Sequence, residues 1–192
     1  GWLLAATAVT GWWLARPRLG PWWWSAAVIV VAWATLPRWT DRPHFEMHML
    51  AVGDGSCYVL RHGRETTLFD AGSITSTNMA AGSILPALRH LGIVRADRLI
   101  VSHPNLDHYN AGPELIRALR IQEVVVNRFF IAAAERDGPA AALLTAAERA
   151  RARVTVAHAG DDRRFGHVTY HWRHPDRADR FRNWNDASSV IE

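Results

Sequence analysis

The segment 102–108 constrains this chain most, because it places metal-binding side chains at the end of an apolar run. Residues 97–101 are typical of a buried strand, and a helix is expected to begin near residue 112. Between them stand His103, Asn105, Asp107 and His108, which follow a His-x-(His/Asp)-x-Asp-His pattern with an amide at one ligand position. Imidazole nitrogen and carboxylate oxygen suit zinc and related metals. The segment therefore predicts a hydrolytic metal site at a strand end, with a neutral and weaker ligand at Asn105.

Two parts of different composition make up the 192 residues, enough for one ordinary domain and an appendage. Residues 1–36 contain only two charged side chains, Arg16 and Arg18, whereas the remainder is charged and rich in arginine. The net charge of +4 and the isoelectric point near 10.2 are compatible with binding to phosphates or to an anionic membrane, without distinguishing them. The single cysteine, Cys57, excludes an intrachain disulfide and a cysteine-based zinc site.

The apolar N-terminal region predicts a transmembrane hairpin over residues 1–36, interpreted as the end of a membrane bundle. Residues 22–36 are uncharged and, with the flanking prolines, just reach the roughly 17 residues needed to span a bilayer. Tryptophans at both ends fit an interfacial aromatic belt. The alternative is a buried hairpin of a soluble protein. Arg16 and Arg18 place the tight loop in the cytoplasm and the rest of the chain outside, whereas the arginines of an expected linker at 37–43 favour the opposite orientation.

Residues 44–192 are expected to form one α/β domain. Apolar runs bounded by glycine-containing turns predict strands at 44–52, 56–61, 66–70, 97–101, 123–126, 153–157 and 167–172. Helical spacing of apolar residues predicts helices at 79–91, 112–120 and 138–151. An arginine-rich loop extends to about residue 183, and another strand begins near residue 188. A β meander followed by alternating strands and helices indicates a layered α/β domain.

Two further groups of residues are candidates for function. Asp70 closes an apolar strand, where a carboxylate could orient a metal-binding histidine from behind; the alternative is an aspartate that caps a turn. The stretch 171–184 mixes arginine with aromatic side chains, as grooves for single-stranded nucleic acid do; the alternative is a solvated loop. Its candidate nucleic-acid ligands are Arg173, Arg177, Arg180 and Arg182.

Four motifs, in order, resemble those of the metallo-β-lactamase domain of ComEC-type competence proteins, which are membrane proteins associated with DNA internalization. They run from Met49 to Ser56, Leu68 to Gly72, Ile84 to Arg89 and Val101 to His108. The segment from Asn185 to Ile191 resembles an Asn-x-x-Ser strand of the same domain. The resemblance covers residues 44–192, and the hydrophobic hairpin agrees with a membrane bundle directly before the domain.

This resemblance implies an αββα sandwich with a metal site at one sheet edge, here truncated on its C-terminal side. It implies a hydrolase that cleaves phosphodiester bonds of DNA with metal-activated water. The residues that match the family's ligand positions are His103, Asn105, Asp107 and His108. Asp107 is also the candidate proton acceptor, and Asp70 matches the aspartate of the family's Asp-x-Gly turn. The implied cofactor is one or two divalent ions, with zinc preferred and manganese as the alternative.

The implied partners are single-stranded DNA, the membrane, the remainder of the same polypeptide and the competence machinery. The implied location is the bacterial cell membrane, with the hydrolase domain on its outer side. Three departures weaken the match. Asn105 replaces the usual Asp or His, and the loop from Gly53 reads Gly-Asp-Gly where many members have Gly-Gln-Gly-Asp. The family's later Gly-Asp and His-His-Gly elements are expected beyond Glu192. Two alternatives stay open: a module that has lost catalysis and guides DNA, and a hydrolase of the same fold for a small ester, thioester or lactone.

Overall fold

The computed structural model describes residues 25, 28–30, 33, 45–76, 78–136 and 138–192. The chain divides into two compact units, residues 1–42 and 43–192. The predicted linker at 37–43 lies outside the described residues, as does the predicted hairpin over 1–36 apart from five helical residues. Among the described helices, none combines the length and the apolar character needed to cross a membrane.

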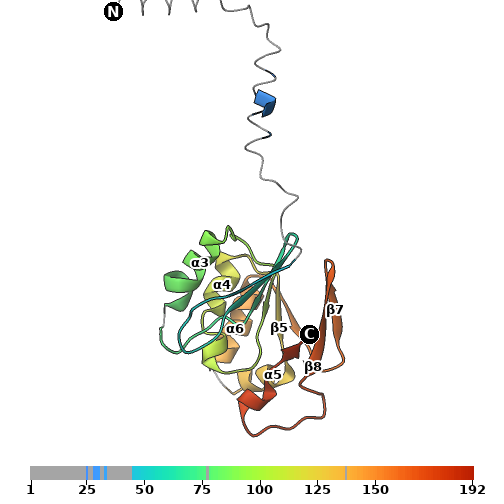
Figure 1. The fold of residues 1–192 in the computed structure, drawn as a ribbon. Coiled ribbons are helices and arrows are strands. Elements are labelled where there is room, and N and C mark those ends of the chain that lie inside the picture. Colours follow the sequence, from blue (N-terminus) through green and yellow to red (C-terminus); the bar gives the residue numbers. More distant parts are fainter. Residues whose placement is uncertain (1–24, 26–27, 31–32, 34–44, 77, 137) are drawn as a thin grey trace, which may run out of the picture. The chain divides into compact units, whose positions relative to one another are not determined.

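The second unit is built on a six-stranded mixed sheet (Figure 1). Its strands lie side by side in sequence order: β1 (Glu46–Met49), β2 (Tyr58–His62), β3 (Glu65–Phe69), β4 (Arg98–Ile100), β5 (Glu123–Val126) and β6 (Arg153–Val156). The first three strands are antiparallel, whereas β3 to β6 run parallel. Parallel neighbours require crossover connections, so the carboxyl ends of β3, β4 and β5 meet at one edge of the sheet.

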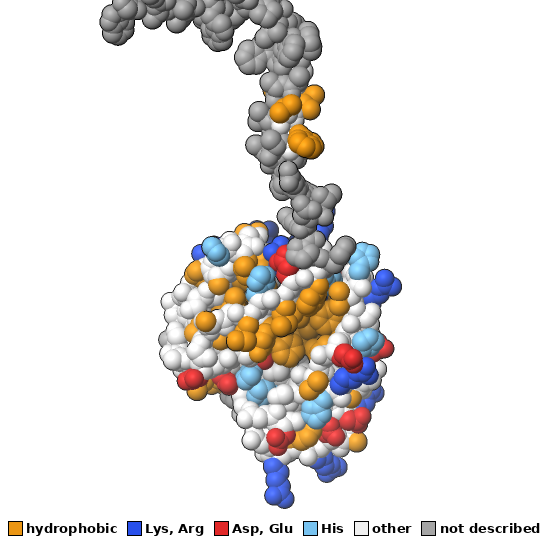
Figure 2. Space-filling view, in the orientation of Figure 1, with side chains coloured by type: hydrophobic (Ala, Val, Ile, Leu, Met, Phe, Trp, Pro, Cys, Tyr) orange, Lys and Arg blue, Asp and Glu red, His pale blue; other side chains and the backbone are white. Residues whose placement is uncertain are grey.

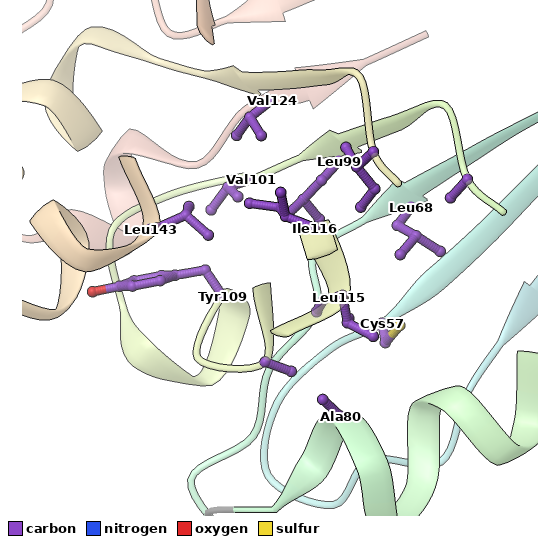
Figure 3. Packing of buried hydrophobic residues seen from close by; sticks show 14 of the residues in the cluster. Cys57, Leu68, Ala80, Leu99, Val101, Tyr109, Leu115, Ile116, Val124 and Leu143 are labelled. Carbon is purple, nitrogen blue, oxygen red and sulfur yellow. The ribbon is translucent and has the colours of Figure 1, made fainter. Parts of the chain in front are cut away.

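Helices cover one face of this sheet (Figure 1). They are α3 (Leu85–His90), entered through a π-helical turn η2 (Ala80–Ile84), then α4 (Gly112–Ala118), α5 (Arg128–Ala134) and α6 (Gly138–Arg149). Alternate strand residues point towards them, and Figure 3 shows strand residues such as Leu68 and Leu99 packed with Leu115 of α4 and Leu143 of α6. These side chains are fully buried. Each such burial stabilises the fold by roughly 1.5–3 kcal/mol, which fixes the strand ends that carry the site.

A second sheet packs on the opposite face. It consists of the antiparallel strands β7 (Asp162–Phe165), β8 (Val168–His174) and β9 (Val190–Ile191), and a 3-10 turn, η4 (Trp184–Ala187), precedes β9. Tyr170 and Trp172 of β8 share a buried cluster with Ile100 of β4 and Val125 of β5. The described residues therefore form three layers, one of helices and two of sheets.

These layers confirm the mixed α/β class and most of the predicted strands and helices. The second helical layer of the predicted αββα sandwich is not among the described residues. Among the described α-helices and strands, two short ones were not predicted. Helix α5 has only seven residues, too few for a helical period to stand out. Strand β7 begins Asp162-Arg163-Arg164, which reads as a loop because its pairing with β8 is not visible in a local pattern.

A groove of about 470 Å³ opens between the two sheets on the side of β1. Its lining is mostly apolar and comprises Phe45, Met47, Tyr58, Leu60, Phe69, Val168, Thr169, Tyr170, Ile191 and Glu192. Figure 2 shows hydrophobic side chains gathered on this face of the molecule. Within the described part of the chain, the core between the sheets is thus left open along β1 and β9.

Candidate metal centre

The site lies where the neighbouring parallel strands β3 and β4 end. Phe69 pairs with Ile100 in the last register position of these strands, so the residues that follow them, Asp70 and Ser102, emerge close together. The Asp70 amide donates to the carbonyl of Ile100 at 2.8 Å, and Asp70 itself has a positive φ of 58°. Aspartate is one of the few non-glycine residues that tolerate this conformation, and here it turns the carboxylate across the strand ends.

The Asp70 carboxylate is the polar centre of the site, with only 2% of the residue exposed. Its Oδ1 accepts from the Ser102 amide at 2.7 Å. Its Oδ2 accepts from the hydroxyls of Ser102 at 2.8 Å and Ser56 at 2.9 Å, and lies 2.7 Å from Nδ1 of His108. A buried carboxylate with this many donors holds them in fixed positions. The contact with His108 is the one predicted for a carboxylate that orients a metal-binding histidine.

His108 lies between two carboxylates. While Nδ1 contacts Asp70, Nε2 lies 3.2 Å from Oδ2 of Asp107. Burial alone lowers the pKa of His108, but the hydrogen bond and the charge of Asp70, helped by Asp107, outweigh it and raise the pKa. The Nε2 position therefore attracts a positive charge, either a proton or a metal cation.

His103 lies beside His108, with 4.0 Å between the ring centroids, and both of its nitrogens have partners. Nδ1 lies 2.9 Å from Oγ of Ser102 and 3.1 Å from Oγ of Ser188. Nε2 lies 3.0 Å from Oδ1 of Asn185. Burial, with the nearby His108 charge, lowers the pKa of His103 despite the opposing effects of Asp70, Asn185 and Asp107. His103 is therefore the neutral imidazole of the pair, the form that binds metals.

Asn105 completes the group of sequence-predicted residues. Its Nδ2 donates to Oδ1 of Asn185 at 2.6 Å, so the same oxygen lies against both His103 and Asn105. The structure thus brings Asp70, His103, Asn105, Asp107 and His108 into one cluster.

Two glycines allow the loops around the site to approach closely. A Cβ on Gly55 would lie 2.3 Å from the carbonyl oxygen of Gly72, and one on Gly72 would lie 2.6 Å from the amide nitrogen of Tyr109. Backbone hydrogen bonds from Ser56 to the Asp107 carbonyl at 3.3 Å and from Ala71 to the His108 carbonyl at 2.7 Å use this closeness. The glycines therefore hold the metal-motif loop against the loop that carries Asp70.

Several residues of the site were not predicted. Asn127, fully buried, caps α5 by accepting from the Phe130 amide at 3.0 Å. Its Nδ2 donates to the carbonyls of Ser102 and Ala187, each at 2.8 Å. Ser56, Ser102, Asn185 and Ser188 were also not predicted as site residues. An asparagine directly after an apolar strand is the signal that could have identified Asn127, because that position is a favoured helix N-cap.

The donor chemistry of the cluster fits a divalent metal. Asp107 and His108 offer a carboxylate oxygen and an imidazole nitrogen side by side, and the buried Asp70 carboxylate adds a negative charge that a cation would balance. The set is nevertheless short of ligands: within the described part of the chain, no group of three or more His, Cys, Asp or Glu is arranged to hold a metal ion.

The predicted nucleic-acid ligands lie on β8 and on the loop after it. Arg173 is bound to Glu192, at 2.8 Å from Nε to Oε2, and Arg177 lies 3.9 Å from Asp161. Arg180 and Arg182 are exposed and have no ion pair within the described part of the chain. The loop is anchored by the Phe181 ring, whose centroid lies 5.2 Å from those of Phe129 and His174.

This loop leads directly into the site. Asn183, next to Arg182, caps η4 by accepting from the Asn185 amide at 3.0 Å, and Asn185 contacts His103. Two unpaired arginines therefore lie within five residues of a side chain that touches the candidate centre.

A family model described as the metallo-beta-lactamase superfamily matches residues 50–176, and none of the curated proteins matches the chain. Among solved structures, rubredoxin oxygen:oxidoreductase from Desulfovibrio gigas is similar with 18% identity, a TM-score of 0.52, and coverage of 79% of this chain and 37% of that one. A flavo di-iron protein variant from Thermotoga maritima has 16% identity, a TM-score of 0.51, and coverage of 72% and 30%. The chain thus spans less than two fifths of the length of either structure. Likeness at this identity shows the fold.

Proposed function

Because the chain belongs to the metallo-β-lactamase superfamily, whose members bind divalent metals, we propose that it carries the site of a metal-dependent hydrolase that cleaves phosphodiester bonds. The observation that carries this proposal is the alignment of Asp70, His108 and Asp107, in which one imidazole is fixed between a buried and a partly exposed carboxylate. Zinc is the preferred metal and manganese the alternative, as one or two ions.

In this proposal the residues of the site have separate chemical roles. A divalent metal, when bound, supplies Lewis acidity and makes water a better nucleophile near neutral pH. Asp70 fixes the ring of His108 so that Nε2 faces the site. The side chain of Asp107 is 31% exposed, so one carboxylate can reach solvent and accept the proton of the attacking water. The neutral His103 offers a second imidazole on the same side.

The positive charge beside the site favours a phosphate-containing substrate. Arg180 and Arg182 are exposed on the segment that enters the site, and arginine binds phosphate oxygens with paired hydrogen bonds. A small, uncharged ester or lactone has no phosphate group with which these arginines could pair. Single-stranded DNA is the proposed substrate. Arg173 and Arg177 extend the basic surface, but their ion pairs with Glu192 and Asp161 reduce their contribution to phosphate binding.

The similarity to ComEC-type competence proteins supplies the proposed setting. In it, the chain is part of a longer membrane protein of the bacterial cell membrane, acts with the competence machinery in DNA uptake, and has its hydrolase domain on the outer side. The apolar, tryptophan-rich residues 1–36 support a membrane location.

A second candidate function is a module that guides DNA without cleaving it. The neutral amide of Asn105 and its contact with Asn185 favour this candidate, because they leave the described cluster short of metal ligands. It predicts DNA binding that weakens steeply with salt and no cleavage under any metal.

The test compares cleavage of end-labelled single-stranded DNA and of a small ester by the intact protein with zinc or manganese. The variants His103→Ala and Asp107→Ala should abolish cleavage, and unchanged cleavage would refute the site assignment.

The double variant Arg180→Ala/Arg182→Ala should weaken DNA binding. It should also lower the slope of log K for DNA binding against log salt concentration by about 1.4, since each lost single-strand phosphate contact contributes about 0.7. Arg149→Ala, an exposed arginine of α6, is the matched control. Preferential cleavage of the ester, unaffected by the double variant, would favour the small-molecule hydrolase.

A further inference from the structure

Two large apolar side chains are exposed to solvent beside the candidate metal centre. Ile74 lies in the loop that follows β3 and Asp70, and it is 68% exposed. Leu106 lies in the metal motif itself, directly before Asp107, and it is 43% exposed. Single exposed apolar residues are common on protein surfaces. These two, however, come from segments that leave the neighbouring parallel strands β3 and β4 at the edge where the site lies, so a substrate of the site would pass them.

Hydrogen bonds hold both segments in place. The side chain of Asn110 fixes the loop of Ile74, because its Oδ1 accepts from the Ser73 amide at 3.1 Å and its Nδ2 donates to the Ser73 carbonyl. The amide of Asn110 donates to the Leu106 carbonyl at 2.9 Å. The Ile74 amide donates to the Asp54 carbonyl, also at 2.9 Å. Both apolar side chains thus extend from an ordered backbone, and a ligand that covers them does not have to order the loops.

The basic loop reaches the same turn. Asn105, next to Leu106, donates from Nδ2 to Oδ1 of Asn185 at 2.6 Å. Arg180 and Arg182, both exposed, lie on the loop that leads to Asn185. A ligand that crosses this edge of the sheet therefore meets positive charge and apolar surface together. A single nucleic-acid strand has the matching chemistry, since it carries a phosphate at every nucleotide and bases whose faces are free to stack.

We propose that Ile74 and Leu106 form an apolar rim that contacts the bases of a single strand, while the basic loop binds its phosphates. Isoleucine and leucine pack against base faces and insert between base steps in other nucleic-acid complexes. The bases of a duplex are already paired and stacked, so the rim selects single strands over duplexes without reading a sequence. The inference rests on the proposed function, since it takes single-stranded DNA as the substrate and names the residues that recognise its unpaired bases.

The test measures binding of labelled DNA to the intact protein by fluorescence anisotropy, with a chelator present so that no strand is cleaved. One probe is an ordinary single strand, and the other is an abasic strand of the same length, which keeps the phosphates and lacks the bases. The double variant Ile74→Thr/Leu106→Gln keeps the approximate size of both side chains. It should bind the ordinary strand about tenfold more weakly, or by about 1.4 kcal/mol, near the lower end for burial of one such side chain. Its binding of the abasic strand should be unchanged.

Val94→Thr is the matched control. Val94 is 78% exposed and precedes β4, at the amino-terminal side of the parallel strands and away from the site, so this variant should bind both probes as the wild type does. An equal loss of both probes by the double variant would overturn the rim, because the fold or the basic loop would then be the cause. No loss, or loss of binding to anionic lipid vesicles instead, would overturn the rim and leave DNA as the proposed substrate. A wild type that binds neither probe would refute the proposed substrate and the rim with it.

Discussion

Asp70 shows how a single residue links the backbone to the chemistry of the site. Its positive φ turns the carboxylate back over the ends of β3 and β4. There the carboxylate accepts hydrogen bonds from two serine hydroxyls and a backbone amide and contacts His108. The sequence predicted this aspartate and the His/Asp cluster because metal-ligand spacing is local. It did not predict Ser56 or Asn185, because hydroxyl and amide side chains form no recognisable spacing, and Asn185 lies 82 residues from His103.

Asp70→Asn should lower the free energy of unfolding by about 2 kcal/mol, because hydrogen bonds to a buried charged group are worth about 1.5–3 kcal/mol. Asparagine tolerates the same backbone conformation, so the change keeps the turn while it removes the charge and replaces one of the two acceptor oxygens by an amide donor. Metal affinity should fall about 10- to 100-fold, as for other partners that orient ligands. Urea unfolding and chelator competition measure the two effects.

Asp161→Asn is the control for that change, because it also breaks an aspartate–histidine contact, 2.7 Å from Nδ1 of His158, in a partly exposed position away from the site. It should leave metal affinity unchanged. If it weakened metal binding as much as Asp70→Asn, the specific role of Asp70 would be contradicted.

Cys57 gives a prediction about pH. Burial, with a smaller contribution from the nearby Asp70 charge, raises the pKa of its thiol from 9.0 to about 12. The native thiol therefore stays neutral. Its contribution to the free energy of unfolding is fully present below pH 9 and is lost as the pH rises from 9 towards 12, because the unfolded chain then gains from ionising the thiol. At pH 8 the thiolate fraction should be about a thousand-fold below that of a free cysteine.

Labelling of Cys57 with an aromatic disulfide reagent at pH 8 checks this. The native chain should react only as fast as it unfolds, whereas the chain in urea should react at the rate of a model thiol, and Cys57→Ser gives the background. Rapid labelling without denaturant would show that the thiol is neither buried nor neutral.

At the scale of the elements, the site is held by segments that the sequence predicted unevenly. The parallel strands and helices α3, α4 and α6 were predicted because their apolar spacing is regular over several residues. Helix α5 and strand β7 were missed because each is short and depends on contacts with distant residues. Asn127 connects three of these segments. It caps α5, and it donates hydrogen bonds to the carbonyl of Ser102, after β4, and to that of Ala187, at the end of η4.

Asn127→Ala should destabilise the fold by about 3 kcal/mol, of which about 1 kcal/mol is the lost cap and the rest comes from two carbonyls left without their donor in a buried place. Asn183→Ala removes a cap in an exposed turn and should lower stability by about 1 kcal/mol or less. Thermal and urea unfolding measure both variants. Equal losses would mean that the buried hydrogen bonds of Asn127 contribute nothing beyond capping.

At the scale of the whole molecule, the described residues form a core that is complete on the helical side and open between the sheets. The groove lined by Met47, Phe69 and Val168 exposes apolar surface along β1. The site lies at the edge of the six-stranded sheet that is built from β3 and β4, where the helices and both sheets constrain the strand ends. The helical core fixes the position of the metal motif, and the basic loop brings charge to it.

The most direct test of the central claim, that the His/Asp cluster is a divalent-metal site, is the metal content of the intact protein by elemental analysis after dialysis against zinc or manganese. We predict stoichiometric metal in the wild type and in a His158→Ala control, whose histidine pairs with Asp161 away from the cluster, and none in His108→Ala. Equal metal in His108→Ala and the wild type, or no metal in either, would contradict it.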